Sequence, residues 1–250
     1  MNDQPPEAGR GIEFGIDIGG TFTDVVCRRA DGSIRLAKVP TSRADPSRAV
    51  LAALGTAGAE WDVATTAITR FAHGTTVATN AVLERKGARV GLITTEGFRD
   101  VLEIGRQMRH QMYDLVLHTE TPVFLAPGHL RREVRERVDA AGRVLVPLDE
   151  ASVRAAVRAL LDQEVQAIAV CLLFSFLAPA HEQRIAAIIE EMRPGLPVSL
   201  SSEVDPAFRE YERTCATAFD AYVKPLVADY LANLEAGLAR AGVGAPLQVM

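Results

Sequence analysis

The chain has 250 residues, of which 48% are hydrophobic and 24% charged, so it can bury a core of ordinary size for one or two globular domains. Its net charge of -5 and pI near 5.6 argue against nucleic acid or a membrane surface as a partner, because phosphate backbones and anionic lipids select basic faces. The first ten residues have neither a basic start nor an apolar segment, so we expect a cytoplasmic protein.

The three cysteines, Cys27, Cys171 and Cys215, are odd in number and lie in apolar or helical contexts. We expect buried thiols in a reducing compartment rather than disulfides. The histidines of the central and C-terminal regions are scattered at His110, His118, His129 and His181, so the spacing does not favour a structural zinc.

The first predicted elements are strands at 13–18 and 21–28, because apolar residues alternate with small or polar ones on both sides of a Gly19-Gly20 turn. Glycines let phosphate oxygens approach backbone N–H groups, hydroxyls can donate to those oxygens, and an acid can hold Mg²⁺ through water. The turn offers all three kinds of group, in Asp17, Gly19, Gly20, Thr21 and Thr23.

An ordinary hairpin turn is the alternative for this segment, with its acid and hydroxyls bonded only to the backbone. Two other phosphate motifs do not fit. A dinucleotide fingerprint would need a third glycine opening a helix, and a Walker loop would need its lysine.

Further elements alternate along the first half of the chain. They are a strand at 34–40 that completes a three-stranded meander, a helix from Asp45-Pro46 towards Gly58, a strand at 68–72, a helix at 75–85 closed by Gly87, and a strand at 89–94. This order places His73, Thr75 and Thr76 where a strand passes into a helix, a place that can hold an anion or a developing oxyanion. We therefore expect them near a reacting centre, with a helix-capping or core histidine as the alternative for His73.

Arginines accumulate between residues 98 and 138, where the periodicity weakens. The segment 131–137 alternates arginine with Glu133 and Glu136, and we interpret it as a solvated strand face of mixed charge. Arg99, Arg106 and Arg109 follow the threonine-rich block and are candidates for binding a substrate carboxylate or a transferred phosphoryl group.

The last hundred residues predict a second layered unit. Its expected elements are a strand at 144–148, a helix opening at Leu148-Asp149 and running to 162, a strand at 167–174, a helix at 179–192, a strand at 198–203, a helix at 208–240 interrupted by Pro225, and a strand from Pro246.

Four stretches carry a family resemblance. They are GIDIGGTFTD at 15–24, HGTTVATNAVLERKG at 73–87 with GLITTEGFRD and LEIGR at 91–106, EVRERV at 133–138, and REYERT at 209–214. The chain from about Gly11 resembles the A-type subunit of the hydantoinase/oxoprolinase family, in the actin-like ATPase superfamily. The resemblance implies an α/β ribonuclease H-like, actin-like ATPase fold. Its mixed sheet would start with a three-stranded antiparallel meander and be flanked by helices.

The resemblance also implies a domain plan. Residues 1–10 would form a disordered tail, 11–205 the N-terminal domain of the family, and 206–250 the start of its core domain. Members of the family are much longer and need a second half with another phosphate loop and an adenosine pocket. We therefore expect this chain to be the N-terminal part of a longer subunit and inactive by itself.

By this resemblance the chain would use ATP and Mg²⁺ to phosphorylate the oxygen of a cyclic amide, a hydantoin or 5-oxoproline type of substrate, with a B-type subunit or domain as partner. Asp17 would hold Mg²⁺ through water, Gly19, Gly20, Thr21 and Thr23 would bind phosphate, and Asp24 would orient them. Two alternatives stay open. One is a carboxylase of the acetone or acetophenone type, and the other is a non-catalytic module that binds a nucleotide or a partner.

Overall fold

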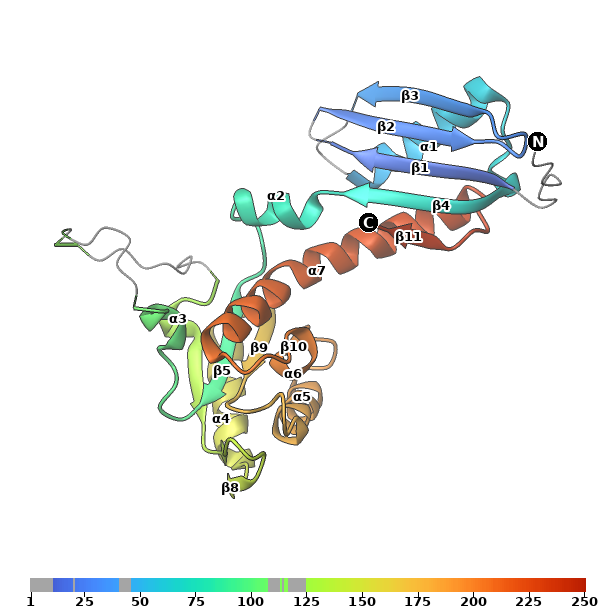
Figure 1. Cartoon of the computed structure of the whole chain (residues 1–250). Coiled ribbons are helices and arrows are strands. Elements are labelled where there is room, and N and C mark those ends of the chain that lie inside the picture. Colours follow the sequence, from blue (N-terminus) through green and yellow to red (C-terminus); the bar gives the residue numbers. More distant parts are fainter. Residues whose placement is uncertain (1–10, 20, 41–45, 108–112, 114, 117–124) are drawn as a thin grey trace, which may run out of the picture. The chain divides into compact units, whose positions relative to one another are not determined.

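The computed structural model describes residues 11–19, 21–40, 46–107, 113, 115–116 and 125–250 of this mixed α/β chain (Figure 1). The chain divides into two compact units. The first unit combines residues 1–80 with 227–250, and the second unit is residues 81–226. Gly20 and Arg109, both predicted site residues, lie outside the described residues, as do His110 and His118.

The first unit contains a five-stranded mixed sheet in the order β11-β4-β1-β2-β3. Strands β1, β2 and β3 form the predicted antiparallel meander, and β4 and β11 both run parallel to β1 on its other side. The fold class expected from the sequence is confirmed. The bounds are β1 Ile12–Ile18, β2 Phe22–Arg28, β3 Ile34–Pro40, β4 Ile68–Thr75 and β11 Leu247–Val249.

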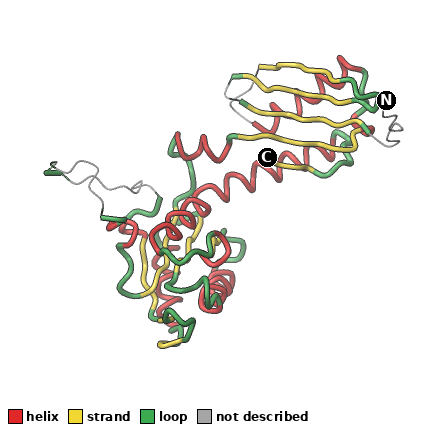
Figure 2. Tube along the Cα trace, viewed as in Figure 1, coloured by secondary structure: helices red, strands yellow, loops and turns green. Residues whose placement is uncertain are grey.

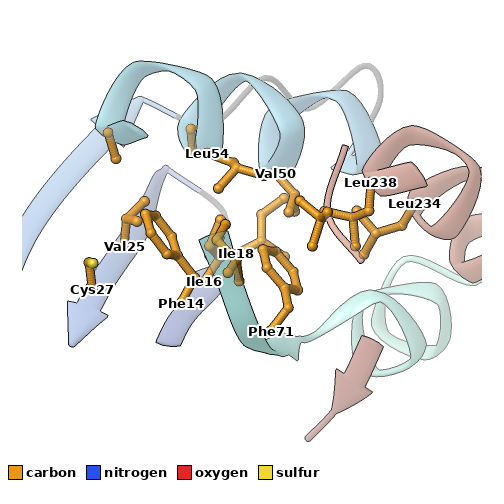
Figure 3. Packing of buried hydrophobic residues seen from close by; sticks show 14 of the residues in the cluster. Phe14, Ile16, Ile18, Val25, Cys27, Val50, Leu54, Phe71, Leu234 and Leu238 are labelled. Atoms are coloured by element: carbon orange, nitrogen blue, oxygen red, sulfur yellow. The ribbon is translucent and has the colours of Figure 1, made fainter. Parts of the chain in front are cut away.

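Helix α1, Pro46–Trp61, covers one face of this sheet because its apolar residues repeat at helical spacing (Figure 3). Val50 and Leu54 are fully buried against Phe14 and the neighbouring strand residues, and full burial of a leucine contributes about 2 kcal/mol. Leu234 and Leu238, one turn apart near the end of helix α7, join the same core. The five strands and two helical segments therefore share one hydrophobic core.

The second unit contains a four-stranded, all-parallel sheet in the order β10-β9-β5-β6. Figure 2 shows strands in yellow and helices in red in this unit. Every residue of β5 and β9 is buried, as expected where a parallel sheet is covered on both faces. A two-stranded hairpin, β7 with β8, is added to the unit. The bounds are β5 Val90–Thr95, β6 Arg131–Val134, β7 Arg137–Val138, β8 Val144–Val146, β9 Ala167–Cys171 and β10 Val198–Leu200.

Helices α2, α4, α5 and α7 follow the predicted order, whereas α3 and α6 were not predicted. Asp149 caps α4, as predicted, because its Oδ1 accepts the backbone N–H groups of Ala151 at 3.0 Å and Ser152 at 3.4 Å. Helices α2 and α7 each contain a boundary between the units. The bounds are α2 Val77–Leu83, α3 Val101–Ile104, α4 Glu150–Leu161, α5 Ala180–Met192, α6 Ser201–Val204 and α7 Glu210–Arg240, with short 3₁₀ turns at Thr65–Ala67 and Gly128–Leu130.

Several predicted boundaries were wrong. The strand expected at 198–203 stops at Leu200, because Ser201 and Ser202 bond to the buried Glu182 and begin helix α6. The strand expected at 167–174 ends at Cys171 and passes into a turn in which Phe174 has a φ of 55°. Strand β4 runs on to Thr75, and helix α2 begins two residues later than predicted.

The segment 131–137 is not a solvated face of mixed charge, because two of its charged side chains are buried. Arg131 donates from Nε to the Ala126 carbonyl at 2.8 Å and from Nη1 to Glu103 at 3.1 Å. Glu136 is buried with partners of its own, described below. The burial of these two side chains depends on partners elsewhere in the sequence, and the periodicity of a segment does not reveal such partners.

The predicted state of the cysteines is confirmed in most respects. All three are free thiols; Cys27 and Cys171 are buried, while Cys215 is half-buried. Burial raises the pKa of the Cys27 and Cys171 thiols above their usual value, which disfavours the reactive thiolate. Among the described residues, no helix combines the length and apolar character needed to cross a membrane.

Candidate functional site

Asp17 lies near the end of β1, at the edge of the first sheet where the parallel strands β1 and β4 both finish. Its register partner on β4 is Gly74, and its antiparallel partner on β2 is Asp24. Because directly paired residues lie on the same face of a sheet, Asp17, Gly74 and Asp24 form one row. The two neighbours of Asp17 on β1 are buried in the core, and Asp17 itself is exposed on the opposite face.

Gly74 gives the Asp17 carboxylate its space. A Cβ at position 74 would lie 2.6 Å from Asp17 Oδ1, closer than real side-chain contacts allow. Any other residue at position 74 would therefore push the carboxylate aside. No described residue hydrogen-bonds or ion-pairs with Asp17, so its oxygens remain open to a group from solution.

The turn after β1 is tight at its first residue. The backbone N–H of Gly19 donates to the Phe22 carbonyl at 3.0 Å, and a Cβ on Gly19 would lie only 3.0 Å from that oxygen. Thr21 is exposed at the start of β2. The structure thus brings Asp17, Gly19 and Thr21 to one edge of the sheet.

Thr23 and Asp24 lie on opposite faces of β2. Thr23 is fully buried and pairs with Ile18 on the core side, so the described structure does not bring its hydroxyl to the face that Asp17 occupies. Asp24 lies beside Asp17 on the open face and forms an exposed ion pair with Lys38 at 3.1 Å. Asp24 is therefore a neighbour of Asp17 on the open face with Lys38 as its ionic partner, and Thr23 is buried on the other face.

His73 is enclosed by protein, which matches the core alternative for this residue. It is fully buried, its Nδ1 lies 2.9 Å from the Ile16 carbonyl, and its Nε2 lies 2.5 Å from the Tyr230 hydroxyl. A carbonyl only accepts, so Nδ1 carries the proton and Nε2 accepts from Tyr230. Burial lowers the pKa of His73 below 6.5, against the opposing effects of the Ile16 carbonyl and the charge of Asp17.

Thr75 and Thr76 shape the start of helix α2. The Thr75 hydroxyl accepts the Val77 N–H at 3.3 Å, and the Thr76 hydroxyl accepts from the Asn80 side chain at 3.1 Å. Thr75 pairs with Ile18 across β1 and β4, one residue beyond Asp17 and Gly74. Thr75 therefore lies at the same strand end as Asp17 but on the core face, and Thr76 follows it as an exposed residue.

Arg99 and Arg106, the described members of the predicted substrate group, belong to the second unit and already have acidic partners. Arg99 lies 3.3 Å from Asp100, with both side chains about half exposed. Arg106 donates to Glu212 at 2.8 Å and lies over the Tyr211 ring at 5.8 Å. Their role in binding a substrate stays a prediction.

The residues at the carboxyl ends of β1 and β4 fit a nucleotide phosphate with its metal ion. An exposed carboxylate kept clear by a glycine suits Mg²⁺, which is commonly bound through one or two carboxylates and substrate phosphates. A glycine turn and an exposed threonine add backbone and hydroxyl donors for phosphate oxygens. Sequence reasoning selected Asp17 and its turn, but it missed Gly74 and Tyr230, whose parts depend on contacts between distant segments.

The strand order, with its antiparallel meander and two further parallel strands, defines an α/β protein with an actin-like fold. The chain belongs to the hydantoinase/oxoprolinase family, because the model of its "hydantoinase/oxoprolinase N-terminal region" matches residues 13–193. The resemblance seen in the sequence is thereby confirmed.

Two curated relatives indicate the range of the family. The chain is 36% identical to the caprolactamase subunit alpha of Pseudomonas jessenii, over 93% of this chain and 34% of the relative. It is 39% identical to the acetophenone carboxylase gamma subunit of Aromatoleum aromaticum, over 84% of this chain and 30% of the relative. The chain thus spans about a third of the length of these curated relatives.

A solved structure agrees with the fold. The ATP-dependent caprolactamase from Pseudomonas jessenii superposes with a TM-score of 0.86 at 33% identity, over 95% of this chain and 35% of that one. Its chain, like those of the curated relatives, is about three times as long as the aligned part.

Proposed function

We propose that this chain is part of an ATP-dependent enzyme subunit that opens a cyclic amide of the lactam, hydantoin or 5-oxoproline type. The observation that carries the proposal is the Asp17–Gly74 pair, an exposed carboxylate held clear at a sheet edge in a family with an ATP-dependent caprolactamase. The activity belongs to the complete subunit with its partner, a B-type subunit or domain.

In this proposal Asp17 holds Mg²⁺ through water, while the turn at Gly19 and Gly20 lets phosphate oxygens come close and the Gly20 N–H and the Thr21 hydroxyl bind them. The Gly19 N–H itself stays on the Phe22 carbonyl. Asp24 orients Asp17 through their shared row, and Thr23 fixes β2 against the core. ATP supplies the phosphoryl group that activates the oxygen of the resonance-stabilised amide. At the end of β4 the exposed Thr76 adds a hydroxyl near this site, whereas Thr75 lies on the core face with Ile18 and His73 supports β4 from inside.

A carboxylase is the second candidate, favoured by the 39% identity to the acetophenone carboxylase gamma subunit. In that case the same edge would bind ATP for activation of a ketone enolate or of bicarbonate. The phosphate-binding groups would be shared by both reactions, so the distinction lies in the substrate and its product.

One assay separates these candidates. The assembled enzyme would be incubated with Mg-ATP, ¹⁴C-bicarbonate and, in turn, a lactam, a hydantoin and a ketone. We expect ATP-dependent ring opening without ¹⁴C in any organic product. Label in a ketone-derived acid without ring opening would replace the hydrolase by the carboxylase, and turnover unaffected by Asp17→Ala would favour a non-catalytic module.

A further inference from the structure

Two carboxylates are buried at the carboxyl end of the second sheet, and the proposed function uses neither. Both Glu136 and Glu182 have side chains removed from solvent. In open α/β sheets, ligands bind outside the carboxyl ends of the strands, so a polar side chain at this place can contact a ligand. The two glutamates differ in the kind of partner they have.

Glu182 has structural partners throughout. Its Oε1 accepts the Leu172 N–H at 2.9 Å and the Ser201 hydroxyl at 2.6 Å, and its Oε2 accepts the N–H and hydroxyl of Ser202 at 2.9 and 2.7 Å. These four neutral donors satisfy both oxygens and join the end of β9 to the start of α6. Glu182 is therefore part of the scaffold.

Glu136 has a titratable partner. Its Oε1 accepts the hydroxyl of Thr95, the last residue of β5, and its Oε2 lies 2.8 Å from Nδ1 of His181 in the first turn of α5. The Thr95 oxygen also accepts the Leu173 N–H at 3.0 Å, so the hydroxyl proton is directed at Glu136. The chain of bonds fixes the carboxylate against His181.

This arrangement fixes the state of the imidazole ring. Because the carboxylate of Glu136 accepts from Nδ1, the neutral His181 ring keeps its lone pair on Nε2. Nε2 has no hydrogen-bond partner within the described residues, and 14% of the side chain is exposed. His181 therefore offers the lone pair of Nε2 at the surface, with the orientation of its ring fixed from behind by Glu136.

A strained turn adjoins the same group. Phe174, next to the Leu173 that bonds to Thr95, has a φ of 55°, a conformation that a bulky residue rarely adopts. Such strain persists where surrounding structure enforces it, and it clusters at functional sites. Two independent features, an oriented histidine and a strained residue, thus coincide at the carboxyl edge.

We propose that His181, held by Glu136, is a proton-transfer residue for the ring-opening reaction. The inference rests on the proposed function and adds a residue to it. Nε2 takes a proton from water as the water oxygen bonds to the amide carbon. It returns that proton to the ring nitrogen as the carbon–nitrogen bond breaks, so the histidine ends neutral and the ring nitrogen becomes an amine. The phosphorylated oxygen stays on the carbon as an acyl phosphate, which a second water hydrolyses to the carboxylic acid and inorganic phosphate.

The test compares variants of the assembled enzyme that opens the ring. His181→Gln is expected to lower kcat by about 10²–10⁴-fold, the usual contribution of acid–base catalysis. Glu136→Gln, which keeps the shape and hydrogen bonds but removes the charge, is expected to lower kcat less. His129→Gln, an exposed histidine of the same unit, is the matched control and should match the wild type.

Added imidazole distinguishes chemistry from support. His181→Ala should regain turnover in proportion to free imidazole, whereas a structural clasp between Glu136 and His181 would show no such dependence. Wild-type turnover in both His181→Gln and Glu136→Gln would overturn the inference alone. A wild-type enzyme that opens no lactam or hydantoin would overturn the proposed function, and this inference with it.

Discussion

The carboxyl edges of the two sheets hold the same chemical group in opposite environments. In the first unit, Asp17 is exposed and a glycine keeps its surroundings clear. In the second unit, Glu136 and Glu182 are buried and hydrogen-bonded by the protein itself. The exposed Asp17 can therefore bind an ion from solution. The buried carboxylates already have protein partners: Glu182 is bonded to the scaffold, and Glu136 to His181.

The largest effect on activity is expected from Asp17→Asn. We expect ATP-dependent turnover of the assembled enzyme to fall by about 10²–10³-fold, because the group that binds Mg²⁺ loses its charge. The free energy of unfolding should change by less than about 0.5 kcal/mol, because the side chain is exposed. Steady-state kinetics and urea unfolding measure the two effects.

Two further variants test whether the loss depends on the position of the Asp17 carboxylate. Gly74→Ala should reproduce much of the kinetic loss, because the new Cβ would displace the Asp17 carboxylate. Asp31→Asn, an exposed acid in the β2–β3 turn, is the control and should leave kcat unchanged. Full activity in Gly74→Ala would contradict the part given to the Asp17–Gly74 pair.

Glu182→Ala should have the reverse profile, with a large loss of stability. Removing the carboxylate leaves the buried N–H of Leu172 and the part-buried N–H of Ser202 without their acceptor, at a cost of about 2–4 kcal/mol. The midpoint of urea unfolding, followed by circular dichroism, measures the loss. An unchanged midpoint would mean that water replaces Glu182, and that it is not part of the scaffold.

One glycine in each unit permits a matched packing test. A Cβ on Gly87 would lie 2.1 Å from the Tyr222 ring, and one on Gly237 would lie 2.2 Å from Leu51. Each Gly→Ala change should destabilise its own unit by about 1–3 kcal/mol through overpacking. Hydrogen exchange, which resolves the two units, should show the increase in the altered unit first, and equal exchange throughout would contradict this localisation.

The smallest expected effect concerns His73 and pH. Burial lowers its pKa in the folded state, so the unfolded chain binds more protons at this position. Its contribution to stability is therefore lost as the pH falls through the unfolded value near 6.5. Urea midpoints at pH 7.5 and 5.5 should differ less in His73→Gln than in the wild type, and an equal difference would show that other groups govern this range.

The sequence correctly predicted those strands and helices whose burial pattern or capping depends on residues that are neighbours in the sequence. The alternation in β1 and β2 reports burial on one face, and Asp149 marks the start of α4 through its own capping bonds. Helix α6 was predicted as a strand because its start depends on Glu182, about twenty residues away. Short elements of this kind are set by tertiary contacts, which a window of sequence does not contain.

The candidate site shows the same division. Asp17 and its turn were recognisable because an acid, glycines and hydroxyls are neighbours in the sequence. The space that Gly74 provides follows from the register of β1 and β4, and the core role of His73 follows from Tyr230, 157 residues away. The buried Arg131 and Glu136 escaped prediction for the same reason, since their charges looked solvated until their partners were known.

The discontinuous first unit has a consequence for synthesis on the ribosome. Its sheet needs β11, and its core needs the residues of α7 beyond 226, whereas the second unit is complete once residue 226 has emerged. The inserted unit can therefore fold while the strands before it still wait for their last neighbour. Limited proteolysis of a chain stopped at residue 226 should find residues 81–226 protected and the preceding strands cleaved.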